Sequence, residues 1–483
     1  MKSVTRLAAN VGLGALVYAM TMNAIAQDTP LTRAAIALGV DNVKSLRYTA
    51  DGTGYSFGQA YKPGLAWPKI HIDSLTRTID YESGSMRDEV AFWRAEGLGG
   101  GGYPMSGVTR NDQYLSGNFA WNQLATAPLP GPRFLSDRTH QLWITPHGVL
   151  RAAMRNKAVV QSAANGGNAF VFTEPNRFSA KVFVNSKGLV ERVESKAPDA
   201  VLGDTTIVTT YSDYRDFNGV MFPERIRQTQ GGFPVLDLTV RQVERNVPVS
   251  IQVPELVRTA SERVAVDKVA DGVWMMGGGS HNSVLIEMKD HLVLVEAPLT
   301  EGRTGAVIAE ARKVVPNKPL RYVINSHPHF DHSGGLRTAA GEGLTIVTQA
   351  QNKAYFERAF GNPNSIAPDR LAKSGKRAQF HVVGEKGKLT DGSRTIELYR
   401  AQDSHHSDSF LIVYLPKEKL LIEADLFTPA APNSPPPARP NPHHTNLIEN
   451  LERLNLKPER IVPLHGRVVP VADLYTAAGA KMQ

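Results

Sequence analysis

The chain of 483 residues contains no cysteine. This absence excludes disulfide bonds, and it also excludes thiolate ligands to a metal. Any metal site in this protein must therefore be built from histidine and carboxylate side chains. Low-complexity sequence is also lacking, and hydrophobic residues make up 42% of the chain, which is enough for well-formed cores.

Clustered positive charge is lacking as well. The formal net charge is +8, but the basic residues are scattered along the chain, and aromatic residues make up only 7%. A basic patch with interleaved aromatic residues, which is typical of a nucleic-acid interface, is not found. We therefore expect a small-molecule substrate and no nucleic-acid partner.

Beyond residue 26 the chain lacks an apolar run long enough to cross a membrane. One shorter run occupies residues 7–22, after Lys2 and Arg6, and Ala-Ile-Ala follows at 24–26. This order is typical of a secretory signal peptide with its cleavage site. We expect residues 1–26 to be removed and the mature protein to be periplasmic or secreted. A membrane anchor is the alternative, and the short run interrupted by Asn10 argues against it.

The length indicates more than one domain. Within residues 27–255, apolar and polar residues alternate at a strand period, for example over 181–184, 205–211 and 235–240, with turn sequences between them. This predicts a mainly antiparallel β (α+β) accessory domain. A helical stretch over 137–156 is interrupted by Pro146. A linker at 247–254 precedes a second domain at 262–483, whose strand–helix–strand order predicts an α/β layered fold.

Residues 326–335, Ser-His-Pro-His-Phe-Asp-His-Ser-Gly-Gly, hold three histidines and a carboxylate directly after a predicted buried strand at 320–324. Neutral imidazoles and carboxylates are ligands that suit zinc and similar metals. His327 and His329 are two residues apart, so in an extended turn they point the same way and can hold one ion. Asp331 and His332 follow at once and can reach a second ion.

Three further candidate ligands lie at the edges of predicted strands, where loops gather and sites are built. His406 precedes the apolar run 410–415, Asp425 follows 420–424, and His465 follows 461–464. With the histidine turn, these residues supply ligands for a site with two metal ions.

In these residues the second domain resembles the metallo-β-lactamase fold superfamily, over about residues 262–483. His327, His329, Asp331 and His332 match its His-x-His-x-Asp-His motif. The resemblance implies an αββα sandwich with the metals at one edge of the two sheets. It also implies the following ligand sets: His327, His329 and His406 on one metal, Asp331, His332 and His465 on the other, and Asp425 between them.

Other residues near these motifs are weaker candidates. The family usually has an aspartate where this chain has Glu296, a residue that supports the ligand turn, and the longer Glu296 is a candidate for the same support. His406 is preferred to the adjacent His405 as the ligand, because a small hydroxyl residue and then a strand follow it. His443 and His444 lie in a proline-rich stretch and are expected to be solvated, with a pocket-lining role as the alternative. Six histidines without partners at ligand spacing are expected to be ordinary: His71, His140, His147, His281, His291 and His381.

Together these features predict an exported hydrolase with two Zn²⁺ per chain, in which a metal-bound hydroxide attacks a lactam, lactone or ester-type substrate and Asp331 assists catalysis. The proline-rich segment 427–444 is expected to form part of the substrate rim. Two alternatives stay open. One is a mononuclear iron redox enzyme of the same fold, and the other is a ligand-binding protein with a vestigial metal domain.

Overall fold

The structure is a computed structural model, and it describes residues 29–94, 99–101, 107–163, 167–432, 434 and 439–481. The predicted signal peptide, residues 1–26, lies outside the described residues. Among the helices of the described ranges, none combines the length and the apolar character needed to span a bilayer.

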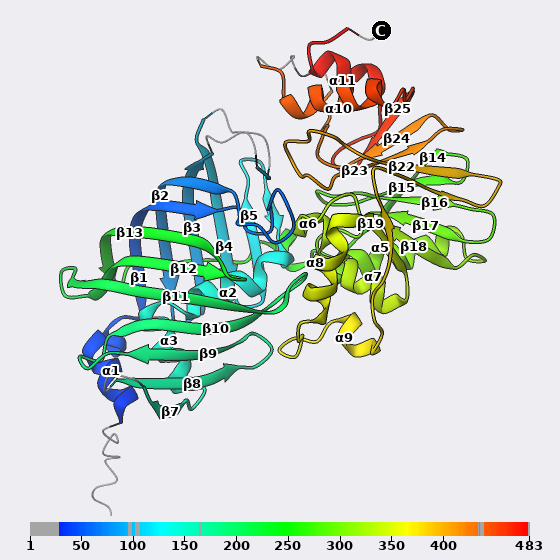
Figure 1. The fold of residues 1–483 in the computed structure, drawn as a ribbon. Helices are drawn as coiled ribbons and strands as arrows, with labels where there is room; N and C mark the ends of the chain where they lie inside the picture. Colours follow the sequence, from blue (N-terminus) through cyan, green and yellow to red (C-terminus); the bar gives the residue numbers. More distant parts are fainter. Residues whose placement is uncertain are drawn as a thin grey trace, which may run out of the picture.

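The N-terminal part of the chain folds into one 13-stranded sheet, in which every strand pairs antiparallel to its neighbours (Figure 1). The predicted antiparallel meander is thus confirmed, and β1 pairs with β13 so that the first and last strands lie together in the middle of the sheet. The strands are β1 (Ser45–Tyr55), β2 (Lys69–Asp80), β3 (Ser85–Trp93), β4 (Thr109–Ser116), β5 (Phe119–Gln123), β6 (Pro128–Pro130), β7 (Val159–Ser162), β8 (Asn168–Glu174), β9 (Phe178–Val184), β10 (Val190–Asp199), β11 (Gly203–Asp216), β12 (Met221–Gln230) and β13 (Phe233–Arg245).

Helices cover one face of this curved sheet (Figure 1). They are α1 (Pro30–Leu38), α2 (Leu135–Trp143) and α3 (Pro146–Arg155), with the 3₁₀ turns η1 (Val40–Asn42) and η2 (Pro132–Phe134). The predicted interruption at Pro146 is confirmed, because Pro146 begins α3 and Thr145 caps it by accepting a hydrogen bond from Gly148 N. Leu142 and Val149 from these helices pack with Phe222 of the sheet in one core.

The C-terminal part contains two further sheets. One has seven strands: β14 (Ala265–Ala270), β15 (Val273–Gly277), β16 (Ser283–Glu287), β17 (Leu292–Val295), β18 (Leu320–Ile324), β19 (Thr345–Gln349) and β20 (Gln379–Val383). The other has six: β21 (Lys386–Thr390), β22 (Thr395–Arg400), β23 (Leu411–Leu415), β24 (Leu420–Glu423), β25 (Arg460–Pro463) and β26 (Val469–Pro470). The helices are α4 (Glu255–Arg258), α5 (Glu301–Val314), α6 (Phe330–Ser333), α7 (Leu336–Glu342), α8 (Ala350–Gly361), α9 (Arg370–Ser374), α10 (Pro442–Arg453) and α11 (Val471–Ala477).

Strand β17 shows how these sheets form the two inner layers. Successive side chains of a strand point to opposite faces, and a strand buried on both faces is apolar throughout. Leu292 and Leu294 pack in the core that contains α5 and α7, whereas Val293 and Val295 pack in the core shared with the second sheet. Helices α10 and α11 contribute to that second core from the far side. The expected αββα sandwich is confirmed.

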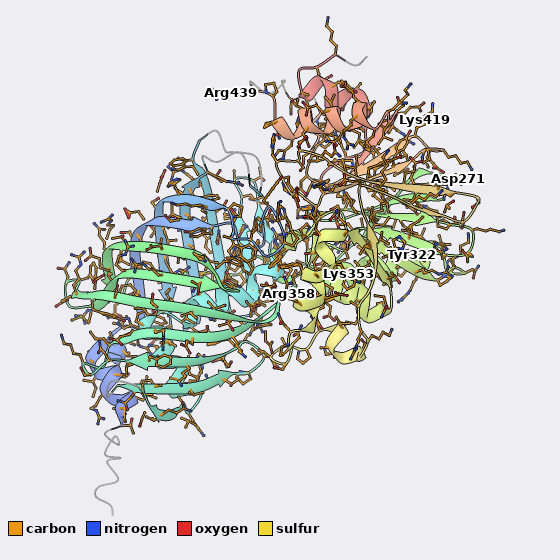
Figure 2. The ribbon with its side chains drawn as sticks, in the orientation of Figure 1. Asp271, Tyr322, Lys353, Arg358, Lys419 and Arg439 are labelled. Atoms are coloured by element: carbon orange, nitrogen blue, oxygen red, sulfur yellow. The ribbon has the colours of Figure 1, made fainter. Side chains whose placement is uncertain are left out.

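The loop between β1 and β2 joins the two parts of the molecule. The carbonyl of Gly58 accepts a hydrogen bond from Phe330 N at 3.1 Å, and the rings of Phe57, Trp67 and Phe330 pack edge to face. Gly58 has a positive φ of 80°, and a Cβ there would lie 2.6 Å from the Phe330 ring. Only glycine suits this close approach. Figure 2 shows the side chains that crowd the boundary, where Arg358 of α8 is labelled.

A second contact lies at the turn between β10 and β11. Asp204 N donates to the carbonyl of Pro363 at 2.7 Å, and the Asp204 carboxylate accepts hydrogen bonds from the backbone and hydroxyl of Ser365 at 2.8 and 2.6 Å. The predicted domain bounds, 27–255 and 262–483, stay predictions. The contacts place the N-terminal sheet directly against the loops that follow β18.

Candidate metal centre

The histidine turn leaves the end of β18, which the structure places at Ile324 as predicted. Strands β17, β18 and β19 run parallel, so their carboxyl ends share one edge of the sheet. His327 and His329 lie in the turn, and α6 carries Asp331 and His332. The other three ligands come from the second sheet: His406 precedes β23, Asp425 follows β24 and His465 follows β25. They lie at the same edge of the sandwich, where the seven predicted ligands meet.

His327, His329 and His406 form a first cluster. Each offers a ring nitrogen, and these three nitrogens lie within 4.8 Å of one another. All three side chains are buried, and His327 Nε2 lies 3.0 Å from His406 Nε2. Three imidazoles converging on one point are a donor set that suits zinc.

The outer contacts of the first cluster hold the rings in place. The hydroxyl of Ser326 lies 3.0 Å from His327 Nδ1. His329 Nε2 lies 3.1 Å from the carbonyl of Ala60, a residue of the N-terminal domain, and its Nδ1 is buried without a hydrogen-bond partner among the described residues. A second nitrogen fixed by a backbone carbonyl sets the tautomer of a ligating histidine. The Ala60 carbonyl therefore leaves His329 Nδ1 as the available donor atom.

Asp425 lies between this cluster and the remaining ligands. One of its carboxylate oxygens, Oδ2, lies 3.5 Å from Nε2 of both His327 and His406 and 2.9 Å from His332 Nε2. The other, Oδ1, lies 3.2 Å from His465 Nε2. The carboxylate thus contacts histidines of both halves of the site, which is the position that the family resemblance implies for it.

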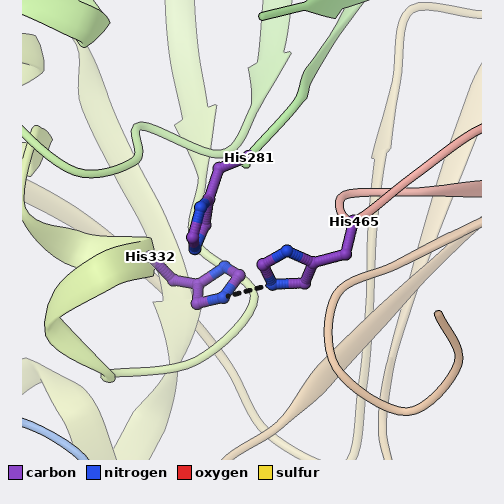
Figure 3. A group of neighbouring side chains, drawn as sticks. All are labelled: His281, His332 and His465. Atoms are coloured by element: carbon purple, nitrogen blue, oxygen red, sulfur yellow. Dashed lines mark hydrogen bonds between the residues drawn. The ribbon is translucent and has the colours of Figure 1, made fainter. Parts of the chain in front are cut away.

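The second cluster contains His332 and His465, together with a residue that the sequence analysis missed. Figure 3 shows the rings of His281, His332 and His465 facing one another, and a ring nitrogen from each lies within 4.8 Å of the others. His332 Nε2 and His465 Nε2 are 3.1 Å apart.

The expectation that His281 is an ordinary histidine is wrong. It precedes β16, and β16 pairs antiparallel with β17, so the start of β16 lies beside the end of β17 at the metal edge. The two adjacent apolar strands can be recognised in the sequence and were the available signal. The spacing of the histidines along the chain does not reveal that His281 joins the other ligands.

Asp331 lies beside the second cluster. Its Oδ1 accepts a hydrogen bond from Gln59 Nε2 at 2.8 Å, and its Oδ2 lies 3.3 Å from His281 Nε2. In this arrangement it is His281 that groups with His332 and His465, while Asp331 contacts His281 and a glutamine of the N-terminal domain. Gln59 is a functional candidate that no motif in the sequence indicates.

Glu296 supports the second cluster from within the core. It is fully buried, and its carboxylate lies 3.0 Å from His332 Nδ1 and bonds to the hydroxyl of Ser326. Asn325 Nδ2 donates to the other oxygen at 3.3 Å. The longer glutamate therefore reaches the ligand turn, at a backbone position with a φ of 76°.

The electrostatics differ between the clusters. Burial lowers the pKa of His327 and His406 well below the ordinary value and lowers the pKa of His329 to about 4. Burial also acts to lower the pKa of His332, but the charges of Asp425 and Asp331 outweigh it, and the pKa rises well above its ordinary value. The first cluster thus presents neutral imidazoles at pH 7, whereas His332 carries a proton in the metal-free chain.

The weaker candidates lie around this centre. His405 is half-buried, and its carbonyl lies 3.4 Å from Gly100 N. The expectation that His443 and His444 are solvated is wrong. Both belong to α10, which begins at Pro442 behind its cap Asn441, and both are buried. The His443 ring packs 5.6 Å from the His406 ring, and His444 packs against Phe427.

The layered fold and the histidine-rich edge define a metal-dependent hydrolase domain. Residues 276–465 match the family model described as the metallo-beta-lactamase superfamily. The C-terminal domain therefore belongs to this superfamily, and no family is assigned to the N-terminal domain.

Similar solved structures cover just under half of the chain. A metallo-beta-lactamase from Pontibacter korlensis is 17% identical, covering 45% of this chain and 98% of its own, with a TM-score of 0.35. The metallo-beta-lactamase FIM-1 from Pseudomonas aeruginosa, in its mono-zinc form, is 19% identical, covering 45% and 95%, with a TM-score of 0.33. Rubredoxin oxygen:oxidoreductase from Desulfovibrio gigas is 20% identical, covering 44% and 61%, with a TM-score of 0.36. No curated protein matches the chain.

Proposed function

We propose that this protein is an exported hydrolase that holds two zinc ions and cleaves a lactam, lactone or ester. The observation that supports this best is the convergence of imidazole nitrogens from both clusters on the carboxylate of Asp425. His329 Nδ1 is buried without a hydrogen-bond partner among the described residues. Buried polar atoms without partners are costly, and a bound cation would satisfy them.

The donor set fits zinc. The first cluster would hold one ion through His327, His329 and His406, and the second would hold another through His332, His465 and His281 or Asp331, with Asp425 reaching both. When bound, zinc lowers the pKa of water to about 7 and polarises a substrate carbonyl.

Asp331 is placed to act on the attacking water through its carboxylate. Burial raises its pKa, but the charge of His332 and the hydrogen bond from His281 lower it more, and the net pKa lies well below the ordinary value. An ionised Asp331 accepts hydrogen bonds, and Gln59 fixes the direction of its carboxylate. It can therefore accept a hydrogen bond from an attacking water and orient it.

The test is hydrolysis by the full chain after chelation and after reloading with zinc, across lactams, lactones, aryl esters, phosphodiesters and alkyl sulfates. We expect about two zinc ions per chain and turnover only in the loaded protein. Hydrolysis by metal-free protein would contradict the proposal, and a single bound iron would favour a redox enzyme.

The proposal of export rests on the N-terminal pattern at residues 1–26. Fractionation of expressing cells, followed by N-terminal sequencing, tests this part separately. We expect a mature chain that begins at Gln27 in the periplasm or medium, and full-length protein in the cytoplasm would contradict it.

A further inference from the structure

A large cleft lies between the two domains. Its volume is about 560 Å³, within the range of small-molecule sites. Strands and helix α2 of the N-terminal domain form most of its wall, and Phe330 and Asp331 line it from the C-terminal domain. Figure 1 shows α6, which carries both of these residues, on the side of its domain that faces the N-terminal sheet. The cleft therefore leads from the metal centre along the N-terminal sheet.

The wall of the cleft combines apolar surface with charged groups. Its apolar part includes Tyr55, Ile70, Phe134, Leu236 and Phe330. A ligand that fills such a space needs a partly apolar body, because burying apolar surface supplies most of the favourable free energy.

Most of the charged groups that line the cleft are already engaged. Arg77 and Asp88 form a buried ion pair at 2.6 Å. Arg138 donates to the carbonyls of Tyr114 and Trp121 at 2.9 and 2.7 Å.

The carboxylates of the cleft are also accounted for. Asp199 accepts backbone hydrogen bonds from Val201 and Leu202 at 2.9 and 2.8 Å. Asp137 is exposed to solvent and lies near the positive charges of Arg138 and Arg77, which act to lower its pKa while desolvation raises it. Neither carboxylate forms an ion pair with Arg133 within the described chain.

Arg133 differs from these groups. Its guanidinium carbon lies 4.5 Å from the ring centre of Phe134, and within the described chain no carboxylate pairs with it and no acceptor bonds to it. Arg133 is exposed to solvent, so its guanidinium is accessible to a ligand; partial burial lowers its pKa, and the negative charge of Asp331 acts in the opposite direction. Arginine remains charged in such a setting and binds carboxylates through two parallel hydrogen bonds.

We propose that this cleft is the substrate-binding site of the metal centre and that Arg133 binds a carboxylate of a partly apolar ester or amide substrate. The proposal rests on the proposed hydrolase function. Because Arg133 and Asp331 line one cleft, a substrate whose carboxylate binds Arg133 extends its scissile bond towards the metal centre. The N-terminal domain then determines specificity, and the C-terminal domain supplies the chemistry.

The first experiment measures binding without turnover. Anilinonaphthalene sulfonate, a fluorescent aromatic anion, is titrated into the full-length protein in metal-free and zinc-loaded form. We expect Arg133→Met to raise the Kd about tenfold, and Arg133→Lys to raise it less. The control is Arg110→Met, a change at an exposed arginine on β4 outside the cleft lining, which should leave the Kd unchanged. Val235→Trp, which fills the cleft from β13, should abolish binding.

The second experiment uses two aryl esters, neutral p-nitrophenyl butyrate and the carboxylated mono-p-nitrophenyl glutarate. Arg133→Met should raise KM for the carboxylated ester about tenfold and leave kcat/KM for the neutral ester unchanged. If the zinc-loaded protein cleaves neither ester, the proposed ester hydrolysis is contradicted. The binding of the fluorescent probe still tests, independently, whether the cleft is a ligand site. A Kd unchanged in Arg133→Met or in Val235→Trp, in protein with the wild-type melting temperature, overturns the proposal.

Discussion

The two halves of the metal centre are built from the same kind of ligand but have different surroundings. The rings of the first cluster (His327, His329 and His406) are supported by neutral groups, namely the Ser326 hydroxyl and the Ala60 carbonyl. The second cluster (His332, His465 and His281) is surrounded by carboxylates, and the side chain of His465 keeps 18% of its exposure. The first cluster is therefore buried, with neutral groups behind its rings, and it shares Asp425 with the second cluster, which has further carboxylates around it and lies closer to solvent.

This difference indicates that the two halves bind metal with different thermodynamics. A metal ligand must be deprotonated before it binds. The imidazoles of the first cluster are neutral at pH 7, so an ion enters without displacing a proton. His332 holds a proton between Asp425 and Glu296 in the metal-free chain, so an ion at the second cluster must displace it. We infer a tighter first site and a weaker second site that depends on pH.

Removing a ligand from the first cluster should have the largest effect. His329→Ala deletes the nitrogen that the Ala60 carbonyl orients, so we expect the bound ion at the first cluster to be lost and hydrolysis to fall to the background rate. Metal analysis and a hydrolysis assay measure both. The control is His381→Ala on β20, where the side chain is exposed. A fully active His329→Ala protein that lacks metal would refute the role given to the whole centre.

Glu296→Gln should separate the two clusters. The amide keeps the shape of the side chain but removes the negative charge beside His332 Nδ1. Loss of such an outer partner typically lowers metal affinity about 10–100-fold, and we expect this loss at the second cluster alone. Zinc titration with a competing chelator measures the two affinities. Glu357→Gln on the surface of α8 is the matched control. An equal loss at both clusters would contradict the division of the centre.

The sequence predicted the first cluster better than the second, for a physical reason. The strand 320–324 and the turn after it are local, so hydrophobic pattern and spacing suffice to place His327 and His329. The β16–β17 hairpin that carries His281 is also local, but it reaches the site only because β17 pairs in parallel with β18, a contact between segments separated along the chain that no histidine spacing reveals.

The same reasoning explains the other surprises. The burial of His444 depends on where α10 packs. The contact of Gln59 with Asp331 depends on how the N-terminal domain docks against the C-terminal domain. The sheet of the N-terminal domain was predictable from its alternation, whereas its closeness to the metal edge was not.

Acid should remove the second ion before the first. As the pH falls through the ordinary histidine value of about 6.5, protons compete for ligands. His332 has a raised pKa and accepts its proton first, whereas the pKa of His329, about 4, delays protonation of the first cluster. Zinc content after dialysis at successive pH values should therefore fall in two steps. In His465→Ala protein only the step at lower pH should remain, and a single step in the wild type would refute the difference between the clusters.

The contact between Gln59 and Asp331 should have the smallest effect. Gln59→Ala removes one hydrogen bond to an ionised carboxylate, which is worth about fivefold to tenfold in kcat. Because that donor favours the charged form, its loss raises the pKa of Asp331, and the acidic limb of the pH–rate profile should move to higher pH. Gln161→Ala, an exposed change on β7, controls for general effects. A uniform drop in kcat with no movement of the acidic limb would mean that Gln59 only packs between the domains. The electrostatics of the second cluster would then not depend on the N-terminal domain.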